Sequence, residues 1–324
     1  MMNRIALKRR VLKRRVLTTA LAAGLIAVQG ASSVYAEEGG AGHYVPGALA
    51  TIIDLPPNKP GTVLEAAYLN YEGDVGTTLA GGLLSTDLEA ESDALLLGGF
   101  YTFEQKVLGA WYSVGAIVPY VDMEVTATVR AGGRSVRRTD QADGLGDITF
   151  MPLMMAWQKD AYQFNAVLPI YAPTGDYEQG RLANPGKNYW TFDPTVGVSY
   201  SGPNLLNWAV HTGFAINTEN NDTDYKSGTV WHVEGSVQKL FPAGSGLIGV
   251  GANAFYYDQI TGDSGKGANL GDFKGKTLGV GPVLTYLRPT ATDSLVFELR
   301  WLPEMDVERR LEGDYIWAKL VYQF

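Results

Sequence analysis

The sequence predicts an all-β protein: a 12-stranded antiparallel transmembrane β-barrel of the outer-membrane type. Three observations predict this fold. The chain begins with an export signal, it ends with an alternating strand whose last residue is Phe324, and tight turns alternate with long connections between strands. No apolar run of ~18 residues follows the export signal, so a membrane span must be built from strands that close into a barrel.

The first 36 residues have the order of a secretory signal peptide. Seven basic and no acidic residues are followed by the apolar stretch Val16–Val28 and then by small residues up to Ala36. This order predicts a signal peptide over residues 1–36, with cleavage after Ala36. We therefore expect export to the outer membrane of a Gram-negative bacterium.

Composition limits the chemistry. Without residues 1–36 the chain holds 19 basic and 34 acidic residues, a net charge of −15. Such an acidic protein is a poor partner for nucleic acid. There is no cysteine, which excludes disulfides, thiolate nucleophiles and cysteine-bound zinc. The three histidines leave little room for a metal site, so we expect no metal and no cofactor.

Residues 37–60 precede the first predicted strand and are rich in glycine and proline. Prolines remove backbone donors, so this segment does not form a regular strand of the sheet. Two interpretations remain open: a flexible periplasmic tail, or a plug folded into the lumen. The apolar residues Ile52, Ile53 and Leu55 favour the plug. Residues 61–324 are predicted to form the barrel.

Twelve strands account for the rest of the chain, with two-residue alternation as the recurring pattern. Most of them exceed the ~9–11 residues that a tilted strand needs to cross the hydrocarbon. Their predicted ranges are 61–73, 92–105, 108–130, 146–158, 161–172, 189–201, 205–217, 229–240, 247–258, 276–287, 294–304 and 314–324.

The connections between these strands alternate in length. Tight turns lie near residues 106, 159, 202–204, 242–246 and 288–290, whereas the intervening connections are long or polar: 74–91, 131–145, 173–188, 218–228, 259–275 and 305–313. Outer-membrane barrels have short turns on the periplasmic rim and long loops on the other rim. An even number of strands places both ends of the barrel on the short-turn rim.

The alternation also assigns side chains to the two faces. In Ser294–Leu302, for example, the apolar residues share one face, and Glu298 and Arg300 share the other. A charge on the lipid face costs ~2–4 kcal/mol at mid-membrane, so Glu234, Glu298 and Arg300 are expected to face the lumen. Aromatic residues near strand ends are expected to form interfacial girdles: Tyr101, Phe103, Trp157, Tyr162, Trp190, Tyr256, Tyr257, Trp317 and Tyr322.

Four blocks of sequence resemble one known family. They are Gly42–Gly47 (GHYVPG), Gly144–Ile148 (GLGDI), Leu168–Tyr177 (LPIYAPTGDY) and Asn184–Pro194 (NPGKNYWTFDP). With these blocks the chain resembles the outer-membrane proteins of the meta-pathway of phenol degradation, also called SphA-like. The resemblance implies a barrel that admits hydrophobic or aromatic small molecules, and it carries no catalytic residues.

Searches for catalytic or ligand motifs give no strong candidate. Gly271–Thr277 is one residue short of a P-loop and precedes a strand where a helix is required. His232 and Ser236 are ~13 Å apart along one strand, too far for a hydrogen bond. Asp222 and Asp224 lack the complete spacing of a calcium loop. We therefore expect no catalytic residues.

The sequence predicts a channel for passive uptake of small hydrophobic or aromatic compounds. The alternatives are a closed structural or adhesive barrel and, third, a barrel hydrolase. Candidate lumen or gate residues are Asp176, His211, Glu234, Glu298 and Arg300. Arg134, Arg137 and Arg138 are candidates for contacts with lipopolysaccharide phosphates, because guanidinium groups bind phosphate bidentately. Expected partners are outer-membrane lipid and lipopolysaccharide, a hydrophobic solute and, through Phe324, the barrel-assembly machinery.

Overall fold

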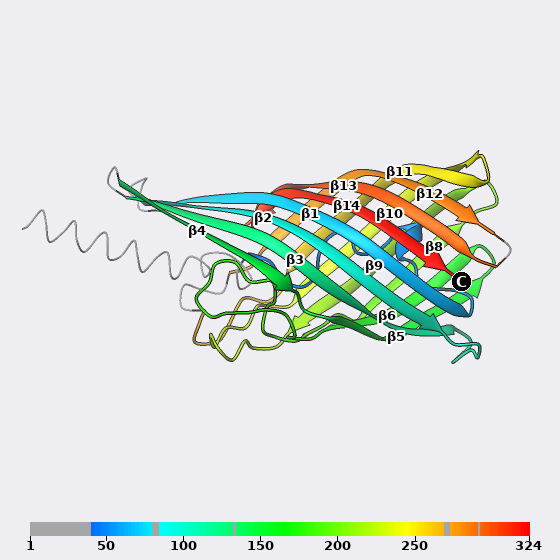
Figure 1. Ribbon diagram of the computed structural model, residues 1–324, viewed down its shortest axis with the longest axis horizontal. Coiled ribbons are helices and arrows are strands. Elements are labelled where there is room, and N and C mark those ends of the chain that lie inside the picture. The colour runs from blue at the N-terminus through cyan, green and yellow to red at the C-terminus, as the bar shows by residue number, and fades with distance from the viewer. Residues whose placement is uncertain (1–39, 80–83, 132–133, 269–272, 291) are drawn as a thin grey trace, which may run out of the picture.

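The computed structural model describes residues 40–79, 84–131, 134–268, 273–290 and 292–324 (Figure 1). The predicted signal peptide lies outside the described residues. One 3-10 turn, η3, is followed by fourteen strand segments. Their bounds are η3 Ile52–Asp54, β1 Gly61–Leu79, β2 Leu84–Thr102, β3 Trp111–Ala131, β4 Arg134–Leu145, β5 Thr149–Lys159, β6 Tyr162–Tyr171, β7 Thr191–Phe192, β8 Thr195–Ser201, β9 Leu206–Asn217, β10 Val230–Ala243, β11 Gly246–Gln259, β12 Lys276–Pro289, β13 Ser294–Glu308 and β14 Glu312–Gln323.

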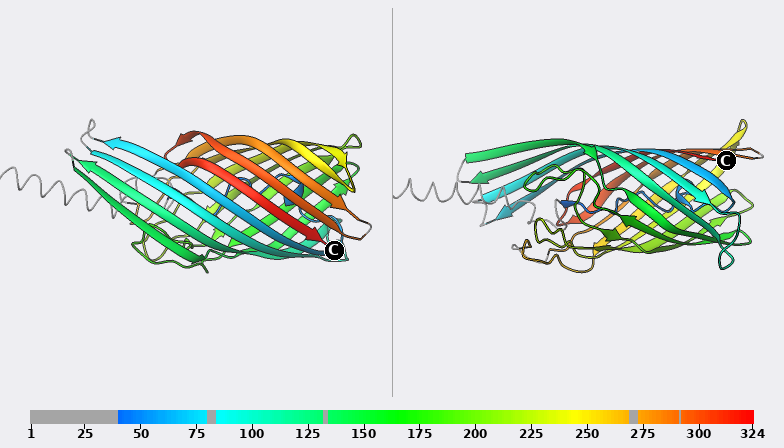
Figure 2. Two further views of the ribbon diagram at one scale, coloured as in Figure 1. Left: turned by 45° about the horizontal axis from the view of Figure 1, so that its top comes forward. Right: turned by 60° about the horizontal axis from the view of Figure 1, so that its bottom comes forward.

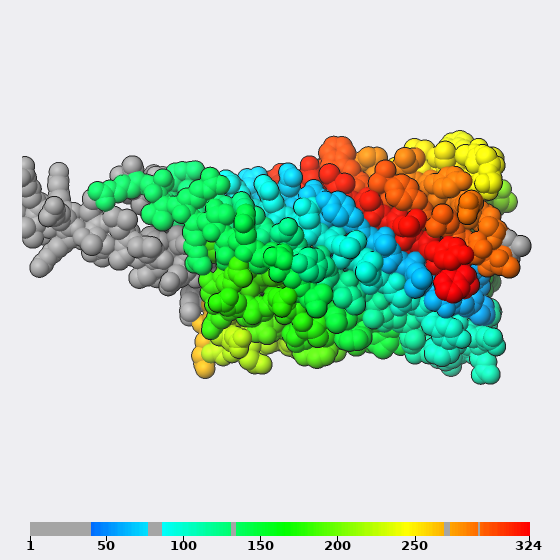
Figure 3. Space-filling view, in the orientation of Figure 1, coloured from blue at the N-terminus to red at the C-terminus, as the bar shows by residue number. Residues whose placement is uncertain are grey.

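The segments form a closed antiparallel barrel of twelve strands. β4 and β5 pair with successive stretches of β3 and act as one strand, and β7 and β8 together fill the place between β6 and β9. β14 pairs with β1 from Val63↔Gln323 to Asp74↔Glu312, which closes the barrel. Figure 3 shows this closure where the red C-terminal strand lies against the blue β1. The predicted fold class is confirmed.

The prediction of long loops at residues 74–91 and 131–145 is wrong. Both stretches are mostly strand. The β1–β2 ladder continues to Leu79↔Leu84, and β3 pairs with β4 up to Ala131↔Arg134. Charged residues made these stretches resemble loops: they lie on the outward face of β1 and β2 and on both faces of β4, where Arg138 and Asp140 share the inward side with Ala142. Figures 1 and 2 show β1 to β4 projecting beyond the other strands at the long-loop rim.

The outer surface is apolar around the barrel wall. Val210, Phe214 and Ile216 on β9 are each more than 40% exposed, as is Trp301 on β13. Of the predicted girdle residues, Tyr101, Phe103, Tyr162, Trp190 and Tyr322 are exposed on this surface, but Trp317 and Tyr257 are buried in the interior, where their strand parity directs them. Among the described residues, no helix is long and apolar enough to cross a bilayer.

A segment that precedes β1 runs through the barrel interior (Figures 1 and 2). We call residues 43–59 the lumen segment. At one end, His43 contacts Asp147, just before β5, at the long-loop rim. At the other end, the Asn58 side chain donates to Gln163 Oε1 at 2.8 Å, next to the tight turn between β5 and β6. The chain therefore crosses the lumen lengthwise before it enters β1 at the short-turn rim.

Candidate functional site

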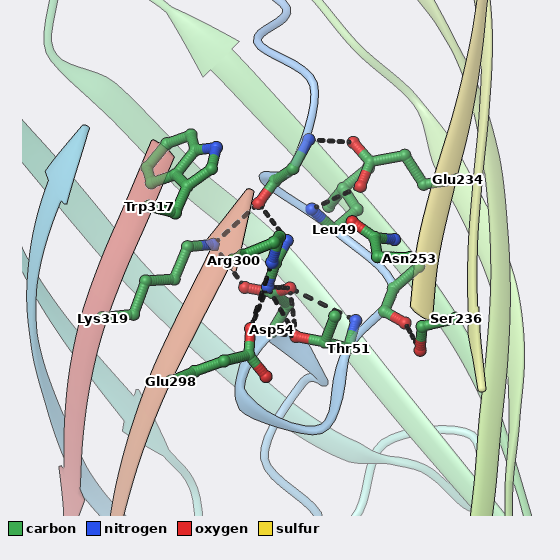
Figure 4. A network of polar contacts seen from close by, with 12 residues as sticks. Leu49, Thr51, Asp54, Glu234, Ser236, Asn253, Glu298, Arg300, Trp317 and Lys319 are labelled. Carbon is green, nitrogen blue, oxygen red and sulfur yellow. Dashed lines mark hydrogen bonds and ion pairs between the residues drawn. The ribbon is translucent and has the colours of Figure 1, made fainter. Parts of the chain in front are cut away.

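The centre of the lumen holds a buried network of charges (Figure 4). Asp54 of η3 lies 2.9 Å from Arg300 Nη2 and 2.6 Å from Lys319 Nζ. Arg300 also pairs with Glu298, two residues earlier on β13. Glu298, Arg300 and Lys319 are each at most 3% exposed. A buried ion pair that loses one partner leaves an uncompensated charge, which costs about 3–5 kcal/mol.

Strand pairing brings these wall residues together. Glu298 on β13 is directly opposite Lys319 on β14, and Arg300 is opposite Trp317, so all four side chains point into the lumen. The lumen segment supplies the remaining partners. Thr51 Oγ1 donates to Glu298 Oε1 at 2.9 Å, and the Thr51 N–H is held by Asp54 at 3.2 Å.

Glu234 on β10 holds the backbone of the lumen segment. Its carboxylate accepts hydrogen bonds from the Tyr44 hydroxyl at 2.8 Å, the Gly47 N–H at 3.1 Å and the Leu49 N–H at 3.2 Å. Ser236, two residues further along β10, donates to the Ala50 carbonyl. Buried backbone groups require partners, so these wall side chains take the place of a neighbouring strand.

β14 contacts the same segment from the opposite direction. Trp317 Nε1 donates to the Pro46 carbonyl at 2.9 Å, and Lys319 donates to the Gly47 carbonyl at 3.0 Å. Gly47 has a φ of +86°, and a Cβ at this position would lie 2.5 Å from Trp317 Nε1. Only glycine fits here, because it tolerates positive φ and lets the backbone approach the indole ring.

The segment is anchored at the long-loop rim by His43. Its ring lies 2.8 Å from Asp147 Oδ2 and 2.7 Å from Thr191 Oγ1, and it stacks on Tyr171 with ring centroids 5.0 Å apart. Burial lowers the pKa of His43, although Asp147 acts to raise it. For Asp147, burial acts to raise the pKa, but the hydrogen bonds from His43, Lys187 and Gly175 lower it. A neutral His43 therefore faces an ionised Asp147.

Tyr44 makes the second contact near this rim. Its ring stacks on His232 with centroids 3.9 Å apart and planes at 13°. His232 Nε2 is in turn 2.8 Å from Asp193 Oδ1, and both side chains are buried. Tyr44 therefore couples the lumen segment to β10 and to the turn between β7 and β8.

Of the lumen or gate residues predicted from the sequence, four lie in the lumen and one lies outside it. Glu234, Glu298 and Arg300 all contact the lumen segment. His211 is directly opposite Glu234 in the β9–β10 ladder, and its Nε2 contacts Asn165 at 3.2 Å. Asp176 lies apart from these residues, in the loop between β6 and β7, where it accepts a hydrogen bond from the Leu145 N–H at 2.9 Å.

Sequence reasoning missed Asp54, Lys319 and Tyr44 as members of the site. The parity of the C-terminal strand does assign Lys319 to the water-facing side, so a signal for this residue was present. Asp54 and Tyr44 lie outside any strand, and no periodic pattern indicates where they point.

The three arginines proposed for lipopolysaccharide lie on the projecting strand β4. Alternation places Arg137 on one face and Arg134 and Arg138 on the other. Arg137 lies 3.5 Å from Glu89, and Arg138 donates to the Gly180 carbonyl at 3.3 Å. Arg137 and Arg138 thus already have partners within the protein, Glu89 and the Gly180 carbonyl. The contact with lipopolysaccharide stays a prediction.

The two histidines that the sequence places on the lumen face are not paired with a serine nucleophile within the described ranges. His211 contacts an asparagine and His232 an aspartate, and neither histidine hydrogen-bonds a serine there. The described residues also contain no group of three acidic or histidine side chains placed to hold a metal ion.

One part of the lumen wall is apolar. Ala67 and Leu69 on β1 and Ala94 on β2 are buried in a cluster with Leu302 and Trp317, and Leu96 and Val121 pack against it. The residues of this cluster on β1 to β3 make no hydrogen bond or ion pair to the lumen segment, whose contacts near the centre of the lumen come from β10, β13 and β14; Glu65 of β1 lies next to that charged network.

The four sequence blocks of the family resemblance meet at the long-loop end of the lumen. His43 contacts Asp147, Tyr171 and Thr191, so it joins all four blocks. The family profile described as "Putative MetA-pathway of phenol degradation" matches residues 73–320. The chain belongs to this family.

Two solved structures that align with this chain are an outer-membrane channel and an autotransporter transport unit. An outer membrane channel from Pseudomonas putida F1 aligns with a TM-score of 0.62 at 14% identity, over 87% of this chain and 100% of that one. The transport unit of the autotransporter AIDA-I from Escherichia coli aligns with a TM-score of 0.43 at 12% identity, over 84% and 93%. Among curated proteins, no sequence matches significantly. The first likeness shows that the two chains share a fold.

Proposed function

We propose that this family member is an outer-membrane channel for passive uptake of small hydrophobic, aromatic compounds. The observation that carries this proposal is the division of the lumen. Polar residues of β10, β13 and β14 hold the lumen segment, whereas Ala67, Leu69, Ala94, Leu96 and Val121 of β1 to β3 form an apolar wall beyond Glu65, the inward carboxylate of β1 beside the charged network. An aromatic hydrocarbon or phenol gains free energy against such a wall, but an ion loses its hydration there.

The lumen segment acts as the plug in this mechanism. It is held in the lumen by hydrogen bonds and ion pairs, with no covalent link to the wall inside the barrel. When these contacts break, the segment moves away from its polar docking residues and opens a passage beside the apolar wall. The solute then diffuses down its gradient. Glu234, Glu298 and Arg300 are the gate residues on the wall, and Asp54 is their partner on the plug.

The proposal is tested by uptake into vesicles with lipopolysaccharide in the outer leaflet. We expect vesicles that contain the protein to take up radiolabelled toluene faster than protein-free vesicles, with no gain for glucose. Lipopolysaccharide slows the background entry of toluene, so the difference is measurable. Equal toluene uptake with and without protein would refute the channel.

A closed structural barrel is the second candidate. The filled lumen favours it, because buried ion pairs and backbone hydrogen bonds hold the segment along much of its length. Planar bilayer recordings separate the two functions. Opening events in the wild-type protein support the channel, and a permanently silent membrane that contains folded protein supports the structural barrel.

Location and partners belong to the same proposal. We infer that residues 1–36 direct export, that the long-loop rim faces the outside, and that the strand ending in Phe324 is recognised by the barrel-assembly machinery. Deletion of Phe324 is then expected to reduce the amount of heat-modifiable barrel in outer-membrane fractions. An unchanged amount would remove this role from Phe324.

A further inference from the structure

The inward face of β3 is apolar along almost the whole strand. From Ile117 to Val129, seven consecutive inward positions carry no charge or hydrogen-bonding side chain. At ~3.3 Å per residue this strip is roughly 40 Å long. On the adjacent β2, the inward positions from Leu88 to Leu96 are leucine, alanine or serine. The two strands together form one uncharged surface, which we call the β2–β3 strip.

The outward face of the same strands marks where the bilayer ends. Leu95 and Tyr120 are directly opposite each other, and both are exposed. The next outward pair towards the long-loop rim is Asp93 and Asp122. Carboxylates do not remain in hydrocarbon, so the membrane boundary lies between these two pairs. The β2–β3 strip, however, continues past this level on the inward face.

The strip forms a continuous path of packed apolar residues. Inside the barrel, Ala94, Leu96 and Val121 belong to the apolar wall of the lumen. Beyond the membrane boundary, Leu88 and Val125 belong to the next apolar cluster. An uncharged surface therefore connects the projecting strands with the middle of the lumen.

Two loop residues cover the outer end of the strip. Leu182 and Ala183 pack in the same cluster as Leu88, Val125 and Ala127. Asp140 on β4 holds their loop: its carboxylate lies 3.1 Å from Arg181 Nη2 and accepts the Leu182 N–H at 2.9 Å. The cover is thus attached by a few polar contacts at the edge of an apolar surface.

We propose that the β2–β3 strip is the binding track for uncharged hydrophobic solutes, and that Leu182 and Ala183 occupy its outer end until a solute displaces them. This inference rests on the proposed channel function and names the route within it. The inward side chains of β2 and β3 carry no charge and therefore favour uncharged solutes, while Arg138 and Asp140 of β4 border the outer end of the strip. Continuity with the lumen wall gives such solutes a path inwards. A solute exchanges its contacts with water for contacts with the strip, step by step along β3.

A charge placed on the strip tests the track. Ala127→Asp introduces a carboxylate on the inward face, and Thr128→Asp introduces the same group one residue away on the outward face. We expect toluene uptake into lipopolysaccharide-containing vesicles to fall about tenfold for Ala127→Asp, because each loss of about 1.4 kcal/mol in binding free energy weakens binding tenfold. Thr128→Asp is expected to behave like the wild type. Heat-modifiable migration shows that each variant is folded.

A second variant and a labelling experiment test the track without relying on Ala127→Asp. Arg181→Ala removes the pair with Asp140 and is expected to speed toluene uptake. A photoreactive aryl diazirine of toluene size is expected to label inward residues between 117 and 129 when it is activated during uptake. If Ala127→Asp fails to fold, the labelling experiment alone decides.

The outcomes separate the track from the channel. No toluene uptake by the wild-type protein refutes the proposed function itself. If the wild-type protein takes up toluene, and Ala127→Asp and Thr128→Asp change this uptake equally or not at all, the track is overturned and the channel stays in place. Labelling confined to outward positions of β3 also overturns the track.

Discussion

Nε2 of His43 lies 2.8 Å from Oδ2 of Asp147, a contact that joins the start of the lumen segment to the turn before β5. The two residues are 104 positions apart in the sequence. This contact fixes the end of the plug that lies farthest from β1, so the segment is held at both ends. Its loss is expected to release the segment at the long-loop rim.

The first prediction concerns this anchor. His43→Ala removes hydrogen bonds to Asp147 and Thr191, a loss of about 1–3 kcal/mol for a buried polar contact. The protein has no cysteine, so Ala48→Cys provides a unique reporter on the segment. We expect maleimide to label this cysteine about tenfold faster in the His43→Ala background. Lys159→Ala, at the opposite rim, is the control; equal labelling in all backgrounds would contradict the anchor.

The second prediction is a dependence on pH. Burial lowers the pKa of His43 below its ordinary value of 6.5. The unfolded or undocked segment therefore binds a proton more readily than the docked one, and docking weakens as the pH falls below about 6.5. The charged groups nearest to His43 are Asp147 and Lys187. We expect the open probability in planar bilayers to rise between pH 7.5 and 5.5.

A matched variant separates this effect from other titrating groups. His43→Gln keeps an N–H donor that can reach Asp147 but does not titrate. We expect this variant to lose most of the rise in open probability over the same pH range. An identical pH profile for the variant and the wild type would show that His43 is not the sensor.

The third prediction concerns the charges at the centre of the lumen. Asp54→Asn leaves Arg300 and Lys319 without their carboxylate on the plug. The weakened plug is expected to open more often, and the loss of one negative charge beside Arg300 and Lys319 is expected to shift ion selectivity towards anions. Single-channel recordings in a salt gradient measure both effects. Glu104→Gln, which removes a charge at an exposed position, is expected to leave the reversal potential unchanged.

The fourth prediction is steric. Gly47→Ala places a methyl group 2.5 Å from Trp317 Nε1 at a φ of +86°, so the segment must move away from β14. Strain of this kind costs about 1–3 kcal/mol. We expect faster maleimide labelling of Ala48→Cys, with the barrel still heat-modifiable. Gly99→Ala, where no atom lies within 4 Å of the new methyl, is the control. Slow labelling in both variants would contradict close packing at Gly47.

The barrel was predictable because alternation is a local property. The apolar residues of each strand indicate which face contacts lipid, as Val210, Phe214 and Ile216 do on β9. On the C-terminal strand, Lys319 indicates the face that points into the lumen. The projecting parts of β1 to β4 were not predictable in the same way. Beyond the membrane boundary, Asp93 and Asp122 replace lipid-facing residues, so the pattern there is that of a polar loop.

The interior of the site was less predictable. The family blocks indicated residues of importance around Asp147 and Asp193, but not that His43 and Tyr44 bind beside them. Contacts such as Asp54 with Arg300 join residues 246 positions apart. Their geometry depends on the closed barrel and on the path of a segment without periodic structure, which no single stretch of sequence specifies.

The central claim is that solutes cross the lumen only when the lumen segment leaves its docked position. Ala50→Cys with Ser236→Cys places two cysteines where a side chain and a backbone carbonyl now hydrogen-bond. We predict that the oxidised, cross-linked protein admits no toluene into lipopolysaccharide-containing vesicles and that reduction restores uptake, whereas Ser236→Cys alone is insensitive to oxidation. Undiminished toluene uptake by the fully cross-linked protein would contradict the account.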